Sequence, residues 1–400
     1  MTDKDYRPRI LHLAFEDYRR PWAGGGSLRT HEINRILANR YDITVLCSSY
    51  PGSKPRIEDG VHYQHIGGFT RSIKASHRAS QLAYFAALPR AIARRRNVDL
   101  ILEDFAAPFG SVGVPAWTRI PTVGIVQWLF ARQQVERYHL PFYAVESLGL
   151  RTHRDLIAVS EDLASELLRR NSHSRVTVIP NGIESSLLGP ISTTQRKDVL
   201  FLGRIDILQK GIDILVRAFA LIVDTVDENL IIAGDGPDEA KVRRLVEDLG
   251  ITKRVRFLGR VGGDSKRLAL DQARILAVPS RSETFGIVAA EGLARGTPVI
   301  AFDIPCLREI VTPEVGVLVG TEGNYDPVRF GAALAEIVGR PDVLADKGRQ
   351  GPQSVARFRW ESAAAAQEAV YQQAIEESRA PHRRHHHHSP QSRWGRTPLE

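Results

Sequence analysis

The sequence predicts an α/β protein built from two doubly wound, Rossmann-like halves. Short apolar runs typical of buried parallel strands alternate with helical patterns. This alternation pauses near residues 183–196 and then begins again. In addition, 400 residues are too many for a single hydrophobic core, so two domains are expected. No short-period repeat is visible, which argues against a solenoid.

The first half begins with the apolar run RILHLAF at 9–15, which predicts a buried strand. We expect the following Gly24-Gly25-Gly26-Ser27 to end a loop, and LRTHEINRILANR to form a helix. The half closes with a strand over VTVIPNG, because Pro180-Asn181-Gly182 is a strong turn signal. The other strands are expected at 43–47, 100–102, 122–126 and 156–159, and a further helix at 160–170.

The second half repeats the pattern. Its strands are expected at 199–202, 230–233, 255–258, 275–278 and 298–301, and its helices include 211–225 and 238–249. The chain then divides into four parts, which are an N-terminal domain at 1–185, a C-terminal domain at 186–358, a helix at 359–378 that packs back on the N-terminal domain, and a disordered tail at 379–400.

Composition limits the partners and the compartment. A net charge of +8 and a pI of about 9.6 favour acidic partners such as phosphates, anionic membranes or nucleic acid, and solvated Arg clusters explain the excess equally well. Two cysteines give no disulfide framework. The chain lacks a signal-peptide core and a bilayer-length apolar run, so we expect a cytoplasmic protein, soluble or attached to the inner membrane face. The tail histidines His385–His388 could bind a transition metal, although an expression remnant or a solvated tail explains them better.

Two signals in the second half point to an anion site. Gly203 ends the first strand and lets a ligand approach the backbone, while Arg204 and Lys210 can converge on one phosphate. Solvated charges beside a helix start are the alternative. Gly234-Asp235-Gly236-Pro237 follows the next strand and permits a tight turn at the edge where open α/β sheets bind ligands, although a simple turn explains it too.

The most specific signal is the segment SETFGIVAAEG, which begins at Ser282. Phe285 and Gly286 fit a turn and 287–295 a helix, whose N-terminus would direct N–H groups at a phosphate. Eight helical residues would place Glu283 and Glu291 roughly 12 Å apart along an extended ligand. The alternative is a helix cap and a surface residue, but the apolar neighbours of Glu291 make an unpaired charge there costly.

Together these motifs resemble the retaining glycosyltransferases of the GT-B fold, specifically family four. The matching segments are LFLGRIDILQKG, IIAGDGP, VRFLGRV and SETFGIVAAEGLARGTPVIAFDIPCLREIV, with looser matches in GGGSLRTHEINRILA, LIAVSEDLASELL and VTVIPNGI. The resemblance extends from about residue 8 to residue 376. It implies two Rossmann-like domains that face a central cleft, with the acceptor bound by the N-terminal domain and the nucleotide-sugar by the C-terminal one.

The resemblance also implies roles for individual residues. Arg204 and Lys210 would hold the diphosphate and stabilise the leaving group, Glu283 would lie beside the donor sugar, and Glu291 would bind the ribose hydroxyls. The other donor-binding positions would be Gly203, Thr284, Phe285, Gly286, Ile287, Arg260 and Val261, with Gly25 and Gly26 facing the phosphates from the opposite domain. The expected partners are a nucleoside-diphosphate-sugar (UDP or GDP) and a hydroxyl acceptor, without nucleic acid and without a metal or other cofactor.

One position departs from the family pattern. Members commonly carry a histidine that touches the donor sugar after the strand matching PTVGIV, and Gln127 stands there in this chain. Gln can hydrogen-bond a sugar hydroxyl but cannot carry a proton near neutral pH. The neighbouring Trp128 and Phe130 could stack on an acceptor or pack in the core. Glu103 and Asp104, after the strand LIL, are weaker candidates for the cleft.

The stretch 71–96 contains seven Lys or Arg residues and no acid. The corresponding region of this fold often meets an anionic membrane that bears a lipid acceptor, and a solvated basic helix is the competing interpretation.

The predicted function is transfer of a hexose-like sugar, with retention of configuration, from the nucleotide to a glycan, lipid or natural product. A GT-B nucleotide-sugar epimerase or disaccharide phosphorylase is the enzymatic alternative. The non-enzymatic alternative is a homologue that binds nucleotide-sugar without turnover. Gln127 is the only residue that favours this alternative.

Overall fold

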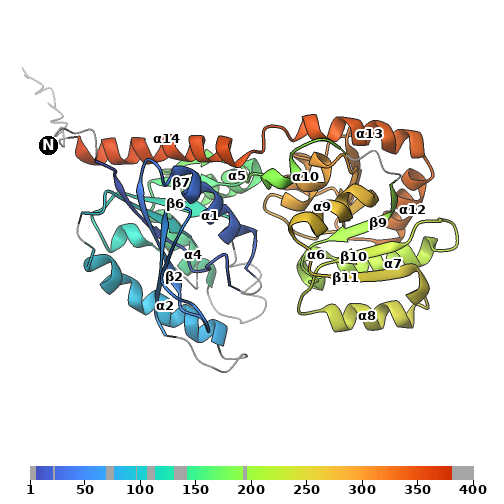
Figure 1. Cartoon of the computed structure of the whole chain (residues 1–400), viewed down its shortest axis with the longest axis horizontal. Helices are drawn as coiled ribbons and strands as arrows, with labels where there is room; N and C mark the ends of the chain where they lie inside the picture. Colours follow the sequence, from blue (N-terminus) through green and yellow to red (C-terminus); the bar gives the residue numbers. More distant parts are fainter. Residues whose placement is uncertain are drawn as a thin grey trace, which may run out of the picture.

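The computed structural model describes residues 6–20, 23–68, 76–95, 97–105, 113–129, 142–191 and 196–380. The chain forms two lobes side by side, each built on a parallel sheet, and a long C-terminal helix lies along the N-terminal lobe (Figure 1). The predicted fold class is therefore confirmed. Several predictions fall outside the described residues, namely those for Phe130, for most of the tail including His385–His388, and for residues 71–75 and Arg96 of the basic stretch.

In the N-terminal lobe, the described strands form one sheet in the order β3-β4-β2-β1-β5-β6-β7-β8, parallel except for β3. The strands are β1 Arg9–Leu13, β2 Asp42–Ser48, β3 Arg56–Glu58, β4 Val61–Ile66, β5 Leu100–Asp104, β6 Thr122–Val126, β7 Asp155–Ala158 and β8 Arg175–Val178. The helices of this lobe are α1 Gly25–Leu37, α2 Ser76–Ala93, α4 Phe142–Arg151, α5 Glu161–Arg170 and α14 Trp360–Arg379, with the short 3-10 turn η2 Val114–Ala116.

In the C-terminal lobe, the described strands form a wholly parallel sheet in the order β11-β10-β9-β12-β13-β14. They are β9 Lys197–Leu202, β10 Leu230–Ala233, β11 Val255–Gly259, β12 Ala273–Val278, β13 Val299–Phe302 and β14 Gly316–Val319. The helices are α6 Ile207–Lys210, α7 Ile212–Ile222, α8 Glu239–Asp248, α9 Gly263–Gln272, α10 Ile287–Ala294, α11 Pro305–Arg308, α12 Pro327–Val338 and α13 Pro341–Ser354, with the 3-10 turns η3 Ser185–Leu187 and η4 Thr252–Arg254.

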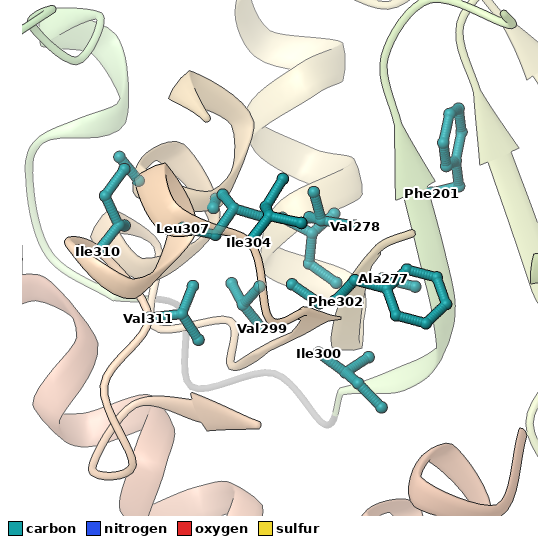
Figure 2. Packing of buried hydrophobic residues seen from close by; sticks show 14 of the residues in the cluster. Phe201, Ala277, Val278, Val299, Ile300, Phe302, Ile304, Leu307, Ile310 and Val311 are labelled. Carbon is teal, nitrogen blue, oxygen red and sulfur yellow. The ribbon is translucent and has the colours of Figure 1, made fainter. Parts of the chain in front are cut away.

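The β13 and β12 side chains of this lobe pack with those of the α11 region into one apolar core. Figure 2 shows Val278, Val299 and Phe302 beside Leu307 and Ile310, all of them buried. Near-continuous apolar runs such as LFL and VIAF are what a parallel strand covered on both faces requires. The strands that lead to the candidate site are therefore anchored in a buried core.

Three strands were not expected. β4 reads VHYQHI and β3 reads RIE, and both carry polar side chains that form specific contacts within the lobe. β14 is a short edge strand. The prediction of a loop through Gly26 was wrong too, because α1 already begins at Gly25.

The chain crosses between the lobes twice, and the two crossings touch. Ile183 pairs with Arg359 as an isolated parallel bridge, and the Ile183 N–H donates to the carbonyl of Phe358. Trp360, 1% exposed, packs directly on Gly182. A Cβ added to Gly182 would lie 2.4 Å from the Trp360 ring and 2.6 Å from its backbone nitrogen. The first crossing thus has room for glycine only.

Helix α14 fixes the second crossing to the N-terminal lobe. It packs against α1, and Tyr371 meets Tyr41 edge-on with the ring centroids 6.1 Å apart. The guanidinium of Arg29, on α1, donates to the carbonyls of Ile179 and Pro180 at 3.0 and 3.1 Å and to Gln367 Oε1 at 2.8 Å. One buried side chain therefore joins α1, the first crossing and α14.

We predict that Gly182→Ala lowers the free energy of unfolding by about 1–3 kcal/mol, because the added methyl group must displace Trp360 or the backbone. Urea denaturation followed by tryptophan fluorescence measures the change. Gly189→Ala is the matched control, because no atom lies within 4 Å of the Cβ position at Gly189. Equal stability of the two variants would contradict this account of the crossing.

Candidate active site

The candidate site lies at the carboxyl ends of β9 and β12, which are neighbours in the middle of the C-terminal sheet. The strand order runs outward from this pair in both directions, so the loops that leave β9 and β12 diverge to opposite sides. In open α/β sheets ligands bind in the crevice at such a switch point. Arg204 follows β9 and Glu283 follows β12, so the topology brings together two residues that are distant in sequence.

Lys210 and Glu283 form an ion pair across this point. The Lys210 Nζ lies 2.5 Å from Glu283 Oε1, and the hydroxyl of Ser280 donates to the same oxygen at 2.8 Å. Lys210 ends the single-turn helix α6, whose N-cap Asp206 accepts from the Gln209 N–H. The two predicted residues are thus in contact. In this structure the Lys210 ammonium, which was expected to hold a phosphate, is paired with the Glu283 carboxylate.

Arg204 is half-exposed and does not share that carboxylate in the structure. Its guanidinium donates to Gln209 Oε1 at 2.7 Å and lies 3.6 Å from Asp206. Gln209 directly precedes Lys210 in the chain. The cations Arg204 and Lys210 therefore lie at the two ends of one short segment, and Gln209 links Arg204 to its far end. Arg204 and Lys210 could therefore bind one anion together.

Gly286 sets the geometry where the loop enters α10. Its φ is +84°, and a Cβ there would lie 2.4 Å from a methyl carbon of Leu307. Only Ile287 and the residues after it are helical, so Glu283 lies four positions before the helix. The expectation of eight helical residues between Glu283 and Glu291 was therefore wrong, and the roughly 12 Å spacing built on it is not supported.

Glu291 is 4% exposed and is neither a surface residue nor unpaired. Its Oε1 accepts from the Nζ of Lys266 on α9 at 2.8 Å, and the same ammonium lies 2.7 Å from Glu184 Oε2. Burial raises the pKa of the Glu291 carboxyl, and the Lys266 charge opposes that rise. Sequence reasoning missed Lys266, although the apolar surroundings of Glu291 required a buried cation from some other segment.

The remaining donor-side residues line the same edge of the sheet. Gly203 ends β9 with a φ of +150°, and nothing lies within 4 Å of its Cβ position. Thr284 is half-buried, and the buried Phe285 meets Phe358 edge-on at 5.2 Å. After β11, Arg260 is exposed and Val261 packs against the core.

On the N-terminal lobe the glycines and Gln127 lie together. The Gln127 side-chain amide donates to the Gly26 carbonyl at 3.2 Å, and its Oε1 lies 3.0 Å from the Cβ position of Gly26. No atom lies within 4 Å of the Cβ positions of Gly24 and Gly25. The first turn of α1 therefore lies beside Gln127 with open space at Gly24 and Gly25, and the Gly24 N–H donates to the Glu16 carboxylate at 3.4 Å, so this helix N-terminus already holds an anionic group.

The two acids after LIL lie on opposite faces of β5. Glu103 is fully buried and accepts from the Val114 N–H at 3.1 Å, with the His153 ring 2.9 Å away, so it is part of the lobe's interior. Asp104 lies on the α1 side, where the Thr30 hydroxyl donates to it at 2.7 Å. Trp128 is half-buried.

The donor-side residues lie close to the junction of the lobes. Glu309, after α11, accepts from the N–H groups of Glu161 and Asp162 at 3.3 Å and so caps α5 of the other lobe. Burial raises the pKa of the Cys306 thiol, and the nearby carboxylates of Glu283, Asp162 and Glu309 raise it further. The pKa of this one buried thiol thus depends on carboxylates of both lobes.

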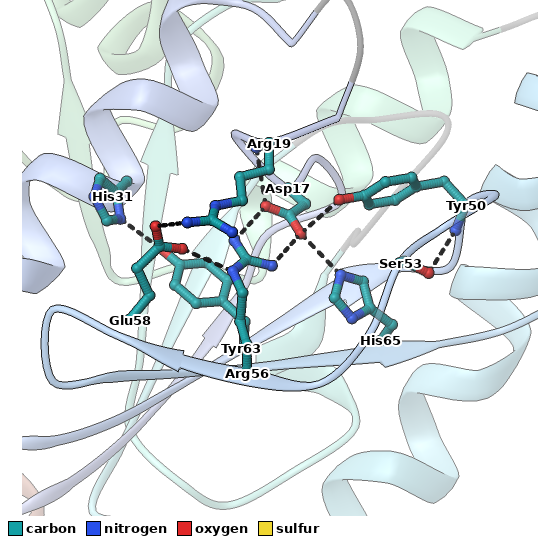
Figure 3. A network of polar contacts seen from close by, with 9 residues as sticks. All are labelled: Asp17, Arg19, His31, Tyr50, Ser53, Arg56, Glu58, Tyr63 and His65. Atoms are coloured by element: carbon teal, nitrogen blue, oxygen red, sulfur yellow. Dashed lines mark hydrogen bonds and ion pairs between the residues drawn. The ribbon is translucent and has the colours of Figure 1, made fainter.

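A polar network joins the loop after β1 to residues of β3, of β4 and of the loop after β2 (Figure 3). The fully buried Asp17 accepts from both terminal nitrogens of Arg56 at 2.6 and 2.8 Å and from the Tyr50 hydroxyl at 3.1 Å, with His65 at 2.9 Å. Burial alone would raise the pKa of Asp17, but these hydrogen bonds and the Arg56 charge hold it well below its usual range. Next to Asp17, burial raises the pKa of Tyr50 to about 12.

Among the residues that the structure describes, no group of three or more His, Cys, Asp and Glu side chains is placed to hold a metal ion. Among the described helices, none is both long enough and apolar enough to traverse a bilayer.

Two family profiles match the chain, one for each lobe. The profile described as "Glycosyltransferase Family 4" matches residues 23–187, and "Glycosyl transferases group 1" matches residues 190–347. A curated relative, the D-inositol 3-phosphate glycosyltransferase 2 of Catenulispora acidiphila, is 35% identical over 246 residues. The match covers 55% of this chain and 56% of that relative, so the chain spans little more than half the length of that protein.

Solved structures share the fold of the whole chain. Sucrose-phosphate synthase from Thermosynechococcus elongatus superposes with a TM-score of 0.77 at 21% identity, covering 93% of this chain and all of that one. Anabaena Alr3699/HepE in complex with UDP-glucose gives 0.70 at 18% identity, covering 91% of this chain and 99% of that one.

We predict that Asp17→Asn lowers the free energy of unfolding at pH 7 by at least about 2 kcal/mol, because it removes the charged acceptor of both terminal nitrogens of Arg56, although Glu58 still pairs with the Arg56 Nε. The native pKa of Asp17 is depressed, so its stabilisation is present above the unfolded value of about 3.9 and disappears as the pH falls below it. The difference between wild type and variant should therefore shrink below about pH 4. Urea titrations at several pH values test this, with the exposed Asp59→Asn as control. A difference independent of pH would contradict it.

Proposed function

Because the chain belongs to the group 1 glycosyltransferases of family 4, with the GT-B fold, we propose that it moves a sugar from UDP or GDP to an acceptor hydroxyl with retention of configuration. The observation that carries the proposal is the Lys210–Glu283 pair at the switch point of the C-terminal sheet, with Arg204 beside it. This group offers two cations to a diphosphate and one carboxylate to sugar hydroxyls.

Donor binding would exchange partners within this group. In the structure Lys210 is neutralised by Glu283, and a diphosphate arriving at Gly203 competes for that ammonium. Once Lys210 and Arg204 hold the phosphates, Glu283 is free to accept hydrogen bonds from the sugar. The backbone from Thr284 to Ile287 and the first turn of α1 at Gly25 and Gly26 would face the same phosphates from the two lobes.

The reaction we propose is a front-face displacement. The bond between C1 of the sugar and the phosphate oxygen breaks, the acceptor oxygen bonds to C1 on the same face, and its proton passes to the departing phosphate. Arg204 and Lys210 stabilise the charge on that phosphate, so the step needs no metal. Gln127, beside the α1 N-terminus, would hydrogen-bond the sugar but cannot exchange its proton near neutral pH.

Support for the donor class also comes from the fold neighbour that was solved with UDP-glucose. The ribose of the nucleotide would meet Glu291, and the base would lie near Arg260 and Val261, which follow β11 at the same edge of the sheet.

The surface of α2 suggests where a lipid acceptor would be presented. Leu82 is 62% exposed, and Phe85 meets Trp117 edge-on at 5.3 Å with both rings about one-third exposed. Arg90, near the end of α2, and Arg94, just after it, are exposed as well. Exposed apolar side chains near cations, in a helix without acidic residues, fit the headgroup region of an anionic bilayer. We therefore propose peripheral attachment at the cytoplasmic face.

We predict that Glu283→Gln lowers sugar transfer by roughly 10²–10³-fold, as expected when a group that acts on the reacting sugar is lost. Arg204→Met should weaken nucleoside diphosphate binding instead, because it removes one of two phosphate cations. The measurements are product formation with UDP- and GDP-sugars, with the anomeric configuration assigned by NMR, and calorimetric titration of UDP and GDP. Normal transfer by Glu283→Gln together with normal binding by Arg204→Met would refute the site. An epimerised donor, or a sugar phosphate product, would identify the alternative enzymes.

We predict that Phe85→Ser lowers binding to vesicles containing phosphatidylglycerol at least about threefold, because an inserted ring contributes by its buried apolar area. Vesicle co-sedimentation measures the effect, with pure phosphatidylcholine as the neutral surface. Leu221→Ser, a 60% exposed position on α7 of the other lobe, is the matched control. Equal losses for both variants, or no preference for anionic lipid, would exclude this surface.

A further inference from the structure

We propose that Lys266 is a positioning residue for the donor, which keeps Glu291 ionised and aimed at the ribose hydroxyls while anchoring it to the segment that links the lobes. The proposal rests on the proposed function, because it assigns Glu291 to a ribose. It adds a residue that lies outside the recognised motif, on a different helix.

The geometry places Lys266 between two carboxylates. Its Nζ is 2.8 Å from Glu291 Oε1 and 2.7 Å from Glu184 Oε2, and the three side chains are 14%, 5% and 32% exposed respectively. An ammonium has three N–H donors, so two can serve these carboxylates at once. The contact made by Lys266 uses one oxygen of Glu291 and leaves the other available for a hydroxyl group.

Charge explains why Glu291 depends on this lysine. Glu291 lies on α10 among the buried Ala289, Ala290 and Leu293, where an isolated carboxylate is strongly disfavoured. Burial raises the pKa of Glu291, Lys266 lowers it, and Glu184 raises it further. Burial also lowers the pKa of Lys266, but the two carboxylates outweigh this and raise it, so the lysine stays charged. Without that cation Glu291 would be neutral over a wider pH range.

An ionised Glu291 can accept hydrogen bonds from both hydroxyls of a ribose, whereas a protonated one has already lost part of that capacity. A hydrogen bond to a charged acceptor is also about twice as strong as a neutral one. Lys266 therefore controls how well the site distinguishes a ribose from a deoxyribose.

Glu184 gives the arrangement its second anchor. It directly follows Ile183, which pairs with Arg359 where the two crossings meet, and η3 begins at the next residue. Helix α9 packs against η3 through this region. The nucleotide anchor is consequently held by a residue that is fixed to the link between the lobes, as well as by its own helix.

The test compares ribose with deoxyribose nucleotides on the full chain. Calorimetry gives the Kd of UDP and GDP, each beside its 2′-deoxy counterpart, for wild type, Lys266→Met and Lys266→Gln. The glutamine variant can still hydrogen-bond both carboxylates and serves if the methionine variant does not fold. Lys241→Met is the matched control, because Lys241 pairs with Asp238 on the surface of the same lobe and is 70% exposed.

We expect wild type and Lys241→Met to prefer the ribose form by about tenfold, as for one hydrogen bond to a charged group. In both Lys266 variants the preference should fall below about twofold through weaker binding of the ribose form, with the deoxy form almost unchanged. As the pH is lowered, the ribose affinity of the Lys266 variants should begin to fall at a higher pH than that of wild type, because Glu291 has lost the cation that opposes the rise of its pKa.

The other results separate the two proposals. If neither UDP nor GDP nor its sugar binds wild type, the proposed function fails. If a nucleotide binds and the Lys266 variants keep the full ribose preference, or lose ribose and deoxyribose forms equally at every pH, the role of Lys266 is overturned while the proposed function stands.

Discussion

The buried guanidinium of Arg29 is the contact that ties α1 and α14 to the segment leading into the first crossing. Burial lowers its pKa to about 10, so it remains charged at neutral pH and must find acceptors inside the protein. It finds them on two segments, namely the stretch 179–181 after β8, through two carbonyls and the side chain of Asn181, and α14, through Gln367. An uncompensated charge at this depth would cost several kcal/mol, which makes the arrangement specific. Because Arg29 lies on α1, the same contact also orients the helix whose first turn carries Gly25 and Gly26.

The two glutamates of the site differ in their counterions, and this difference gives them different chemistry. Glu283 is paired with Lys210, a partly exposed residue on a single-turn helix, so the pair can open when a stronger anion arrives. Glu291 is paired with Lys266, and both side chains are largely buried, so that pair opens less readily. One carboxylate is thus available for exchange during turnover and the other is a fixed part of the pocket.

Much of the fold could be predicted because the residues that end a strand directly follow it in the sequence. Runs such as LFLG and IIAG combine an apolar strand with a glycine that ends it, and the structure ends β9 and β10 there. β4 was not predicted because His62, Gln64 and His65 interrupt its apolar pattern. His65 contacts Asp17, which is distant in sequence. Lys266 was not predicted either, because its partner Glu291 is also distant in sequence. A buried carboxylate shows that a cation is needed, but the segment that supplies it is decided by tertiary packing.

The touching crossings have a consequence for how the protein is made. Domains usually fold in the order in which they leave the ribosome. Here the N-terminal lobe is interrupted, since α14 supplies Trp360 and Tyr371 to its core only after the whole C-terminal lobe has been synthesised. The lobe that is begun first is therefore completed last. For the same reason, an exchange of lobes with a relative cannot be a single cut near residue 185, because the last helix must travel with the first half.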